Sequence, residues 1–115
     1  MARSHELESF DLDFFDDAPV RHVIDVRLPV APERAWAEFT RQHTLDWCRA
    51  IKKIEFVSPE PYGVGTQRRA VLGPGYVTLD EDFFDWTEDP ANGHYRNGFR
   101  VLRANVPGIR RFGEA

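Results

Sequence analysis

The stretch from Val23 to Thr40 constrains the fold more than any other, because a strand pattern runs directly into a helix start. Its first half alternates apolar and polar residues with the period of two that is typical of a half-buried strand. The apolar positions are Ile24, Val26, Leu28 and Val30. Pro32 suits the first helical position, where the missing N–H costs nothing, and Glu33 suits the positive end of the helix dipole. The sequence therefore predicts a strand up to Val30 and a helix from Ala31 to Thr40.

Composition limits the class of protein. The 115 residues are 42% hydrophobic and 13% aromatic, which suits one modest domain with a core. No apolar run reaches the ~18 residues of a membrane span, and the first residues are too acidic for a secretory signal, so we expect a cytoplasmic protein. The single cysteine, Cys48, excludes an internal disulfide framework and a CxxC motif. The formal charge of -4 gives no indication of a nucleic-acid surface.

Charge divides the chain into an acidic arm, residues 1–20, and a domain, residues 21–115. The arm contains one arginine and six acidic residues. Among them stand Leu7, Phe10, Phe14 and Phe15. Two interpretations remain open: a partly ordered arm whose phenylalanines lie on the domain surface, or an acidic and aromatic segment that docks a partner.

The residues after the first helix predict a second short helix followed by strands. Thr44 is a suitable N-cap for a helix from Thr44 to Ala50. Strand patterns separated by Pro and Gly clusters then follow at residues 51–58, 66–72, 76–86, 94–104 and 109–115. Turns this short exclude parallel crossovers, so we predict an α+β domain in which a curved antiparallel sheet closes over helices on one face.

Four motifs in this order carry a family resemblance. They are LPVAPERAWAEFT at residues 28–40, Asp46-Trp47 before a strand, YGVGTQRR at residues 62–69, and FDW at residues 84–86 before a Pro-containing turn. Over roughly residues 21–115 the chain resembles the START-like (SRPBCC) superfamily, in particular its polyketide cyclase/dehydrase and lipid-transport type proteins. The resemblance implies a helix-grip fold, in which a curved sheet and a long C-terminal helix enclose an apolar cavity. Because the chain stops within a late strand, we expect an incomplete domain without the gripping helix.

The resemblance also implies a ligand, since members of the superfamily bind lipids, polyketides or other hydrophobic molecules. We therefore predict that a small hydrophobic ligand binds in an apolar cavity between the sheet and the helices. Pockets of this kind combine aromatic walls with a few polar groups that orient the ligand. The predicted ligand-binding residues are Trp47, Phe56, Arg69, Glu81, Phe83, Tyr95, Asn97 and Phe99.

Glu81 is the acidic residue with the strongest claim to chemistry, because its neighbours on the same strand face are apolar. A carboxylate there needs a partner, such as Arg68 or Arg69 on the neighbouring strand, or has a raised pKa. We interpret Glu81 as part of a structural ion pair at the cavity wall. Two other functions stay open. One is a polyketide aromatase/cyclase or dehydratase in which Arg69 or Tyr95 assists enolisation or dehydration, and the other is a protein-interaction module.

The sequence predicts no metal site, no cofactor and no catalytic residue. Strand alternation separates Asp80 and Asp82 from Glu81 and Asp85, so these acids do not form one ligand set. The Gly-Val-Gly run at residues 63–65 is too short for a phosphate-binding fingerprint and precedes a strand. Without a gripping helix the sheet would keep an exposed apolar face, so we expect a homodimer through that face.

Overall fold

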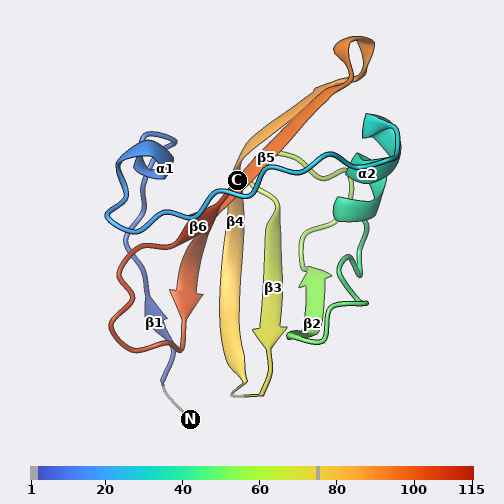
Figure 1. Ribbon diagram of the computed structural model, residues 1–115. Helices are drawn as coiled ribbons and strands as arrows, with labels where there is room; N and C mark the ends of the chain where they lie inside the picture. The colour runs from blue at the N-terminus through green and yellow to red at the C-terminus, as the bar shows by residue number, and fades with distance from the viewer. Residues whose placement is uncertain (1–2, 75) are drawn as a thin grey trace.

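The molecule is built on an antiparallel sheet. The structure, a computed structural model, describes residues 3–74 and 76–115. Its elements are β1 (His5–Glu6), α1 (Phe14–Asp17), α2 (Pro32–Phe39), β2 (Ile51–Phe56), β3 (Gln67–Leu72), β4 (Val77–Asp89), the 3-10 helix η1 (Pro90–Asn92), β5 (His94–Ala104) and β6 (Gly113–Glu114). The strand order is β1-β5-β4-β3-β2, and β6 also pairs with β5 (Figure 1). The predicted α+β class is confirmed.

Helix α2 and strands β2 to β5 lie where the sequence predicts them. Pro32 occupies the start of α2, with Ala31 as its N-cap in an extended conformation. The strand predicted at residues 94–104 coincides with β5, and β2 and β3 differ from prediction by two residues or fewer at each end. Local sequence signals are enough to locate these elements, because the period of the apolar residues and the Pro or Gly breaks lie within each element or at its ends.

The strand predicted at residues 23–30 is wrong. These residues have no regular secondary structure, and their apolar side chains are exposed, for example Ile24 at 75% and Val26 at 67%. Figure 1 shows this part of the chain running from α1 across the sheet to α2. An alternation of apolar and polar residues suits a segment to a strand. A strand forms, however, only where its backbone can hydrogen-bond to a neighbouring strand. The outer edge of β5 is already paired with β1 at residues 103–104 and with β6 at residues 99–100.

The helix predicted from Thr44 to Ala50 is also wrong. Residues 42–47 form consecutive turns, and Leu45 has a φ of 61°. A left-handed residue cannot continue a right-handed helix, so the pattern of apolar residues is not enough. At the other end of the chain, the strand predicted at residues 109–115 is reduced to Gly113–Glu114.

The acidic arm packs against the sheet. β1 pairs with β5 in antiparallel orientation, with His5 opposite Ala104 and Glu6 opposite Arg103. Phe10 is buried, its ring lies 5.7 Å from that of Phe84, and its carbonyl accepts a hydrogen bond from Arg100. The arm therefore contributes both a strand and an aromatic contact to the domain.

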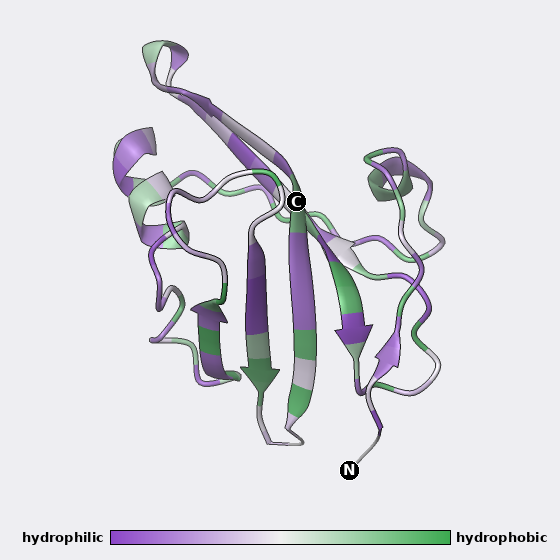
Figure 2. Ribbon diagram, turned by 180° about the vertical axis from the view of Figure 1, so that it is seen from behind, coloured by the Kyte–Doolittle hydropathy of each residue, from purple (hydrophilic) through white to green (hydrophobic). Residues whose placement is uncertain are grey.

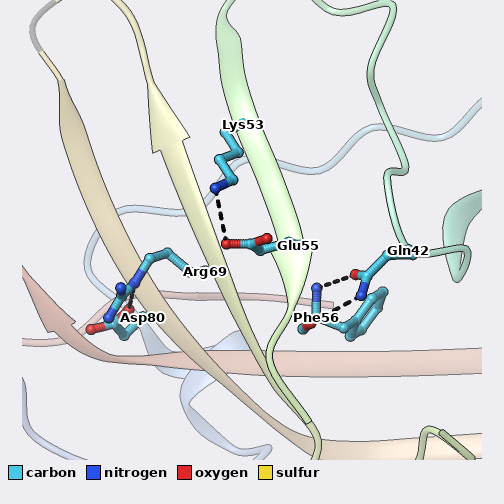
Figure 3. A network of polar contacts seen from close by, with 6 residues as sticks. All are labelled: Gln42, Lys53, Glu55, Phe56, Arg69 and Asp80. Carbon is cyan, nitrogen blue, oxygen red and sulfur yellow. Dashed lines mark hydrogen bonds and ion pairs between the residues drawn. The ribbon is translucent and has the colours of Figure 1, made fainter. Parts of the chain in front are cut away.

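The two faces of the sheet differ in chemistry. One face carries the core of Phe56, Phe83, Phe99, Val101 and Ala104. The other carries a row of alternating charge across five strands, in which Glu55, Arg69, Asp80, Arg103 and Glu6 are successive cross-strand neighbours. Figure 2 shows the resulting alternation of hydrophobic and hydrophilic bands along the strands, and Figure 3 shows the pairs Arg69–Asp80 and Lys53–Glu55. Strand alternation thus separates an apolar interior from a solvated charged face.

The outer edge of β2 is covered by a side chain. The Gln42 amide donates to the Phe56 carbonyl and accepts from the Phe56 N–H, as Figure 3 shows. A strand edge otherwise presents unpaired backbone groups to other chains. Gln42 therefore takes the place of a neighbouring strand at this position.

Candidate functional site

A buried ion pair lies at the centre of the apolar face. Arg68 of β3 and Glu81 of β4 are cross-strand partners, and 2.6 Å separates Arg68 Nε from Glu81 Oε1. Their side chains are only 9% and 3% exposed. Burial raises the pKa of the Glu81 carboxyl to about 7, although the adjacent Arg68 charge acts in the opposite direction. Glu81 therefore changes its protonation state near neutral pH.

Aromatic rings surround the Arg68 guanidinium. Its central carbon lies 4.8 Å from the ring centroid of Phe83, 5.1 Å from that of Phe99 and 5.6 Å from that of Phe56. Cation–π attraction of this kind is strongest where water is excluded. The predicted residues Phe56, Glu81, Phe83 and Phe99 are thus brought together around Arg68.

Sequence reasoning left the partner of Glu81 open between Arg68 and Arg69, and the structure selects Arg68. Arg69 lies on the charged face, where its Nε is 2.6 Å from Asp80 Oδ1 and its side chain is 53% exposed. Neighbouring strand residues point to opposite faces, so only one of the two arginines can reach Glu81. The position of the turn after Leu72 would have identified the partner from sequence. A hairpin that pairs Leu72 with Val77 places Arg68 opposite Glu81.

Seven rings form a continuous aromatic cluster that leads from this core to the surface. Phe83 contacts Phe56, Phe99 and Trp86, with centroid distances of 5.9, 5.5 and 5.3 Å. From Trp86 the cluster continues to Trp36 of α2, and from Trp36 to Tyr95, each at 5.3 Å. Tyr62 stacks on Phe56 at 4.1 Å. We call Trp36, Phe56, Tyr62, Phe83, Trp86, Tyr95 and Phe99 the aromatic cluster.

A groove lies between α2 and the start of β5, at the outer end of the aromatic cluster. Its volume is about 300 Å³, and it is lined by Pro32, Ala35, Trp36, Phe39, Gly93, His94 and Tyr95. The indole N–H groups of Trp36 and Trp86 donate to the two carboxylate oxygens of Glu88, at 3.2 and 3.0 Å. Gly93 closes the turn before β5 with a φ of 61°, a conformation that glycine adopts without strain. Most residues that line the groove are apolar or aromatic, and Glu88 fixes the indole of Trp36, the one tryptophan among them.

The other predicted residues lie apart from one another. Tyr95 lines the groove, and Asn97 is half-buried opposite Trp86 in the β4–β5 register. Trp47 is 69% exposed in the turn region after α2. Arg69 lines a second hollow of about 500 Å³, whose lining also includes Asp80, Arg103 and the Arg68–Glu81 pair. Sequence reasoning missed Trp36, Tyr62 and Trp86, although their aromatic character was a visible signal.

Within residues 3–74 and 76–115, no group of three His, Cys, Asp or Glu side chains is placed to hold a metal ion. Over the same part of the chain, no helix has the length and apolar character needed to cross a membrane.

Comparisons with known proteins give relatives without an assigned activity. No protein-family model matches the chain, and no solved structure matches it. Similar curated proteins include an uncharacterized protein of Mycobacterium bovis and uncharacterized proteins of two strains of Mycobacterium tuberculosis. Each is 32% identical over 80 residues, which are 69% of this chain and 47% of the relative. The chain therefore spans about half the length of the curated relatives that it matches.

Proposed function

We propose that this protein binds a small hydrophobic ligand, lipid or polyketide-like, in the groove between α2 and β5. The observation that carries this proposal is a groove of about 300 Å³, lined mostly by apolar and aromatic residues, at the end of the aromatic cluster. That volume lies at the lower end of the range for small-molecule sites, which are mostly lined by apolar and aromatic side chains. The resemblance to helix-grip proteins of the START-like superfamily supports the same function, because those proteins bind such molecules between sheet and helix.

Tyr95 supplies the polar group that orients the ligand. Partial burial raises the pKa of its hydroxyl, and the carboxylates of Glu33, Glu88 and Asp89 add to this effect. The hydroxyl therefore keeps its proton at neutral pH and can donate to a carbonyl or hydroxyl oxygen of the ligand. The stacked rings of Trp36 and Tyr95 present apolar area to the rest of the molecule.

Replacing Phe39 with serine should weaken ligand binding about tenfold. Phe39 lines the groove and is 47% exposed, so its removal takes apolar wall from the site and little from the core. We expect the substitution to remove about 1.4 kcal/mol of binding free energy, which is less than a fully buried ring provides and corresponds to a tenfold change in affinity. Isothermal titration calorimetry with palmitate and with a flat anthraquinone measures the effect.

Trp47→Ser is the matched control, because it removes another exposed aromatic side chain outside the groove. Its affinity should equal that of the wild type. Absence of binding by the wild-type protein would contradict the proposed function. A loss in Trp47→Ser with none in Phe39→Ser would place the site beside Trp47, as the sequence predicts.

A second candidate function is an aromatase/cyclase or dehydratase that acts on a polyketide. The observation that favours it is the Glu81 pKa of about 7, near the value at which a general acid or base works best at neutral pH. We favour a structural role for Glu81, because its side chain is only 3% exposed and that of its partner Arg68 only 9%.

Glu81→Gln separates the two functions, since it keeps the shape of the side chain and removes its charge. We expect ligand affinity to change by less than about threefold, or about 0.7 kcal/mol. In a cyclisation or dehydration assay, a fall in kcat of ~100-fold or more would instead identify Glu81 as an acid–base catalyst.

A further inference from the structure

Residues 20–30, which we call the crossing segment, expose an unusual amount of apolar surface. Every residue in it is exposed, including Val20, Val23, Ile24, Val26, Leu28 and Val30. Single exposed apolar residues are common on proteins, but contiguous ones mark sites of association. The crossing segment joins α1 to α2 on the surface of the molecule (Figure 1).

The backbone of the crossing segment is available for pairing. Within the part of the chain that the structure describes, no strand pairs with residues 20–30. The segment nevertheless has the alternation of a strand, with Ile24, Val26 and Leu28 on one side and Asp25 and Arg27 on the other. An extended segment with free backbone groups can add to a strand of another chain.

Charge and apolarity single out one register in which the segment pairs with a second copy of itself. If two copies run antiparallel about a two-fold axis at Val26, Ile24 lies opposite Leu28 and Val26 opposite its own copy. On the other side, Asp25 of each chain lies opposite Arg27 of the other. An axis at Asp25 or at Arg27 would instead place like charges opposite each other, which is destabilising.

Pro29 is compatible with this register. Pairs in an antiparallel ladder alternate between hydrogen-bonded and non-hydrogen-bonded positions. If the Val26 pair is hydrogen-bonded, Val23 and Pro29 form a non-hydrogen-bonded pair, where the missing N–H of proline costs nothing. In the same arrangement Asp25 and Arg27 occupy a non-hydrogen-bonded pair, in which side chains approach most closely.

We propose that two copies of this chain form a symmetric dimer through antiparallel pairing of residues 23–29, centred on Val26. A two-fold axis makes the interface isologous, so every charge pair occurs twice. The association does not depend on a bound ligand, because the crossing segment contributes no residue to the groove.

Charge reversal tests the proposal. In sedimentation equilibrium the wild-type chain should be dimeric, whereas Asp25→Arg and Arg27→Asp should each raise the dimer dissociation constant about 10- to 30-fold, because each places two pairs of like charges opposite one another. Equimolar mixing of the two single variants should restore association, since every Arg then faces an Asp. Native mass spectrometry of the mixture should show the heterodimer in excess over either homodimer.

Arg34→Asp, an exposed charge reversal on α2, is the control and should leave the dissociation constant unchanged. A wild-type chain that stays monomeric at about 100 μM, which corresponds to a binding free energy weaker than about 5.5 kcal/mol, would overturn the proposal. A dimer whose dissociation constant is unchanged by both single charge reversals would also overturn the proposal, as would a mixture of the two variants that fails to associate. Either result would indicate that the crossing segment binds a partner other than its own copy.

Discussion

Replacing Arg68 with methionine should lower the free energy of unfolding by about 3 to 5 kcal/mol at pH 8. Methionine keeps an unbranched apolar stem but removes the charge that pairs with Glu81, whose side chain is only 3% exposed. At pH 8 the variant would bury an unpaired carboxylate or would have to protonate it, and both cost free energy. The guanidinium contacts with Phe56, Phe83 and Phe99 are lost as well. Urea unfolding curves measure the change.

Arg69→Met is a closely matched control. Arg69 is the next residue of β3, and its ion pair with Asp80 has the same 2.6 Å separation, but its side chain is 53% exposed. Solvent-exposed pairs contribute at most about 1 kcal/mol. The double variant Arg68→Met/Glu81→Met should recover most of the lost stability, because an apolar replacement leaves no buried charge. Equal losses of unfolding free energy in Arg68→Met and Arg69→Met would contradict the prediction, because they would show that burial does not increase the effect of removing the arginine.

Glu81 should make the protein less stable as the pH rises, by up to ~3 kcal/mol between pH 4.5 and 8. Its pKa is raised from 4.5 to about 7 in the folded state. Between those values the unfolded chain has lost the proton that the folded chain retains, so stability decreases with increasing pH. The contribution is complete below pH 4.5 and is lost as the pH passes about 7, and 2.5 pKa units correspond to ~3 kcal/mol.

Comparison with Glu81→Gln isolates this effect from the other carboxylates of the chain. Glutamine does not titrate, so the difference in unfolding free energy between the variant and the wild type should change in favour of the variant from pH 5 to pH 8. Unfolding curves at several pH values give that difference directly. Parallel pH profiles for the two proteins would rule out a raised pKa at Glu81.

Local physical chemistry made much of the fold predictable from sequence. Pro32 and Glu33 define the start of α2, because the geometry of a first helical turn depends on the residues in it. Alternation and Gly or Pro breaks likewise locate β2 to β5. For the same reason the sequence identified Glu81 as a carboxyl on an apolar strand face, and the structure shows it buried.

The candidate site was predictable only in part. Phe56, Phe83, Tyr95 and Phe99 belong to the aromatic cluster, as their positions in strands suggest. Trp47 does not, because its region forms turns around Leu45 instead of a helix. Trp36 and Trp86 meet through the packing of α2 against the long β4–β5 hairpin, a contact between residues 50 positions apart.

Sequence by itself determined the elements that depend on neighbouring residues. These are the start of α2, the positions of β2 to β5 to within about three residues at each end, and the separation of an apolar face from a charged one. Tertiary structure alone decided that Arg68 and not Arg69 meets Glu81, because cross-strand register sets which side chains share a face. It also decided that residues 23–30 stay outside the sheet. A strand pattern describes one chain segment, whereas a strand requires hydrogen bonds from a second one, and β5 already receives these from β1 and β6.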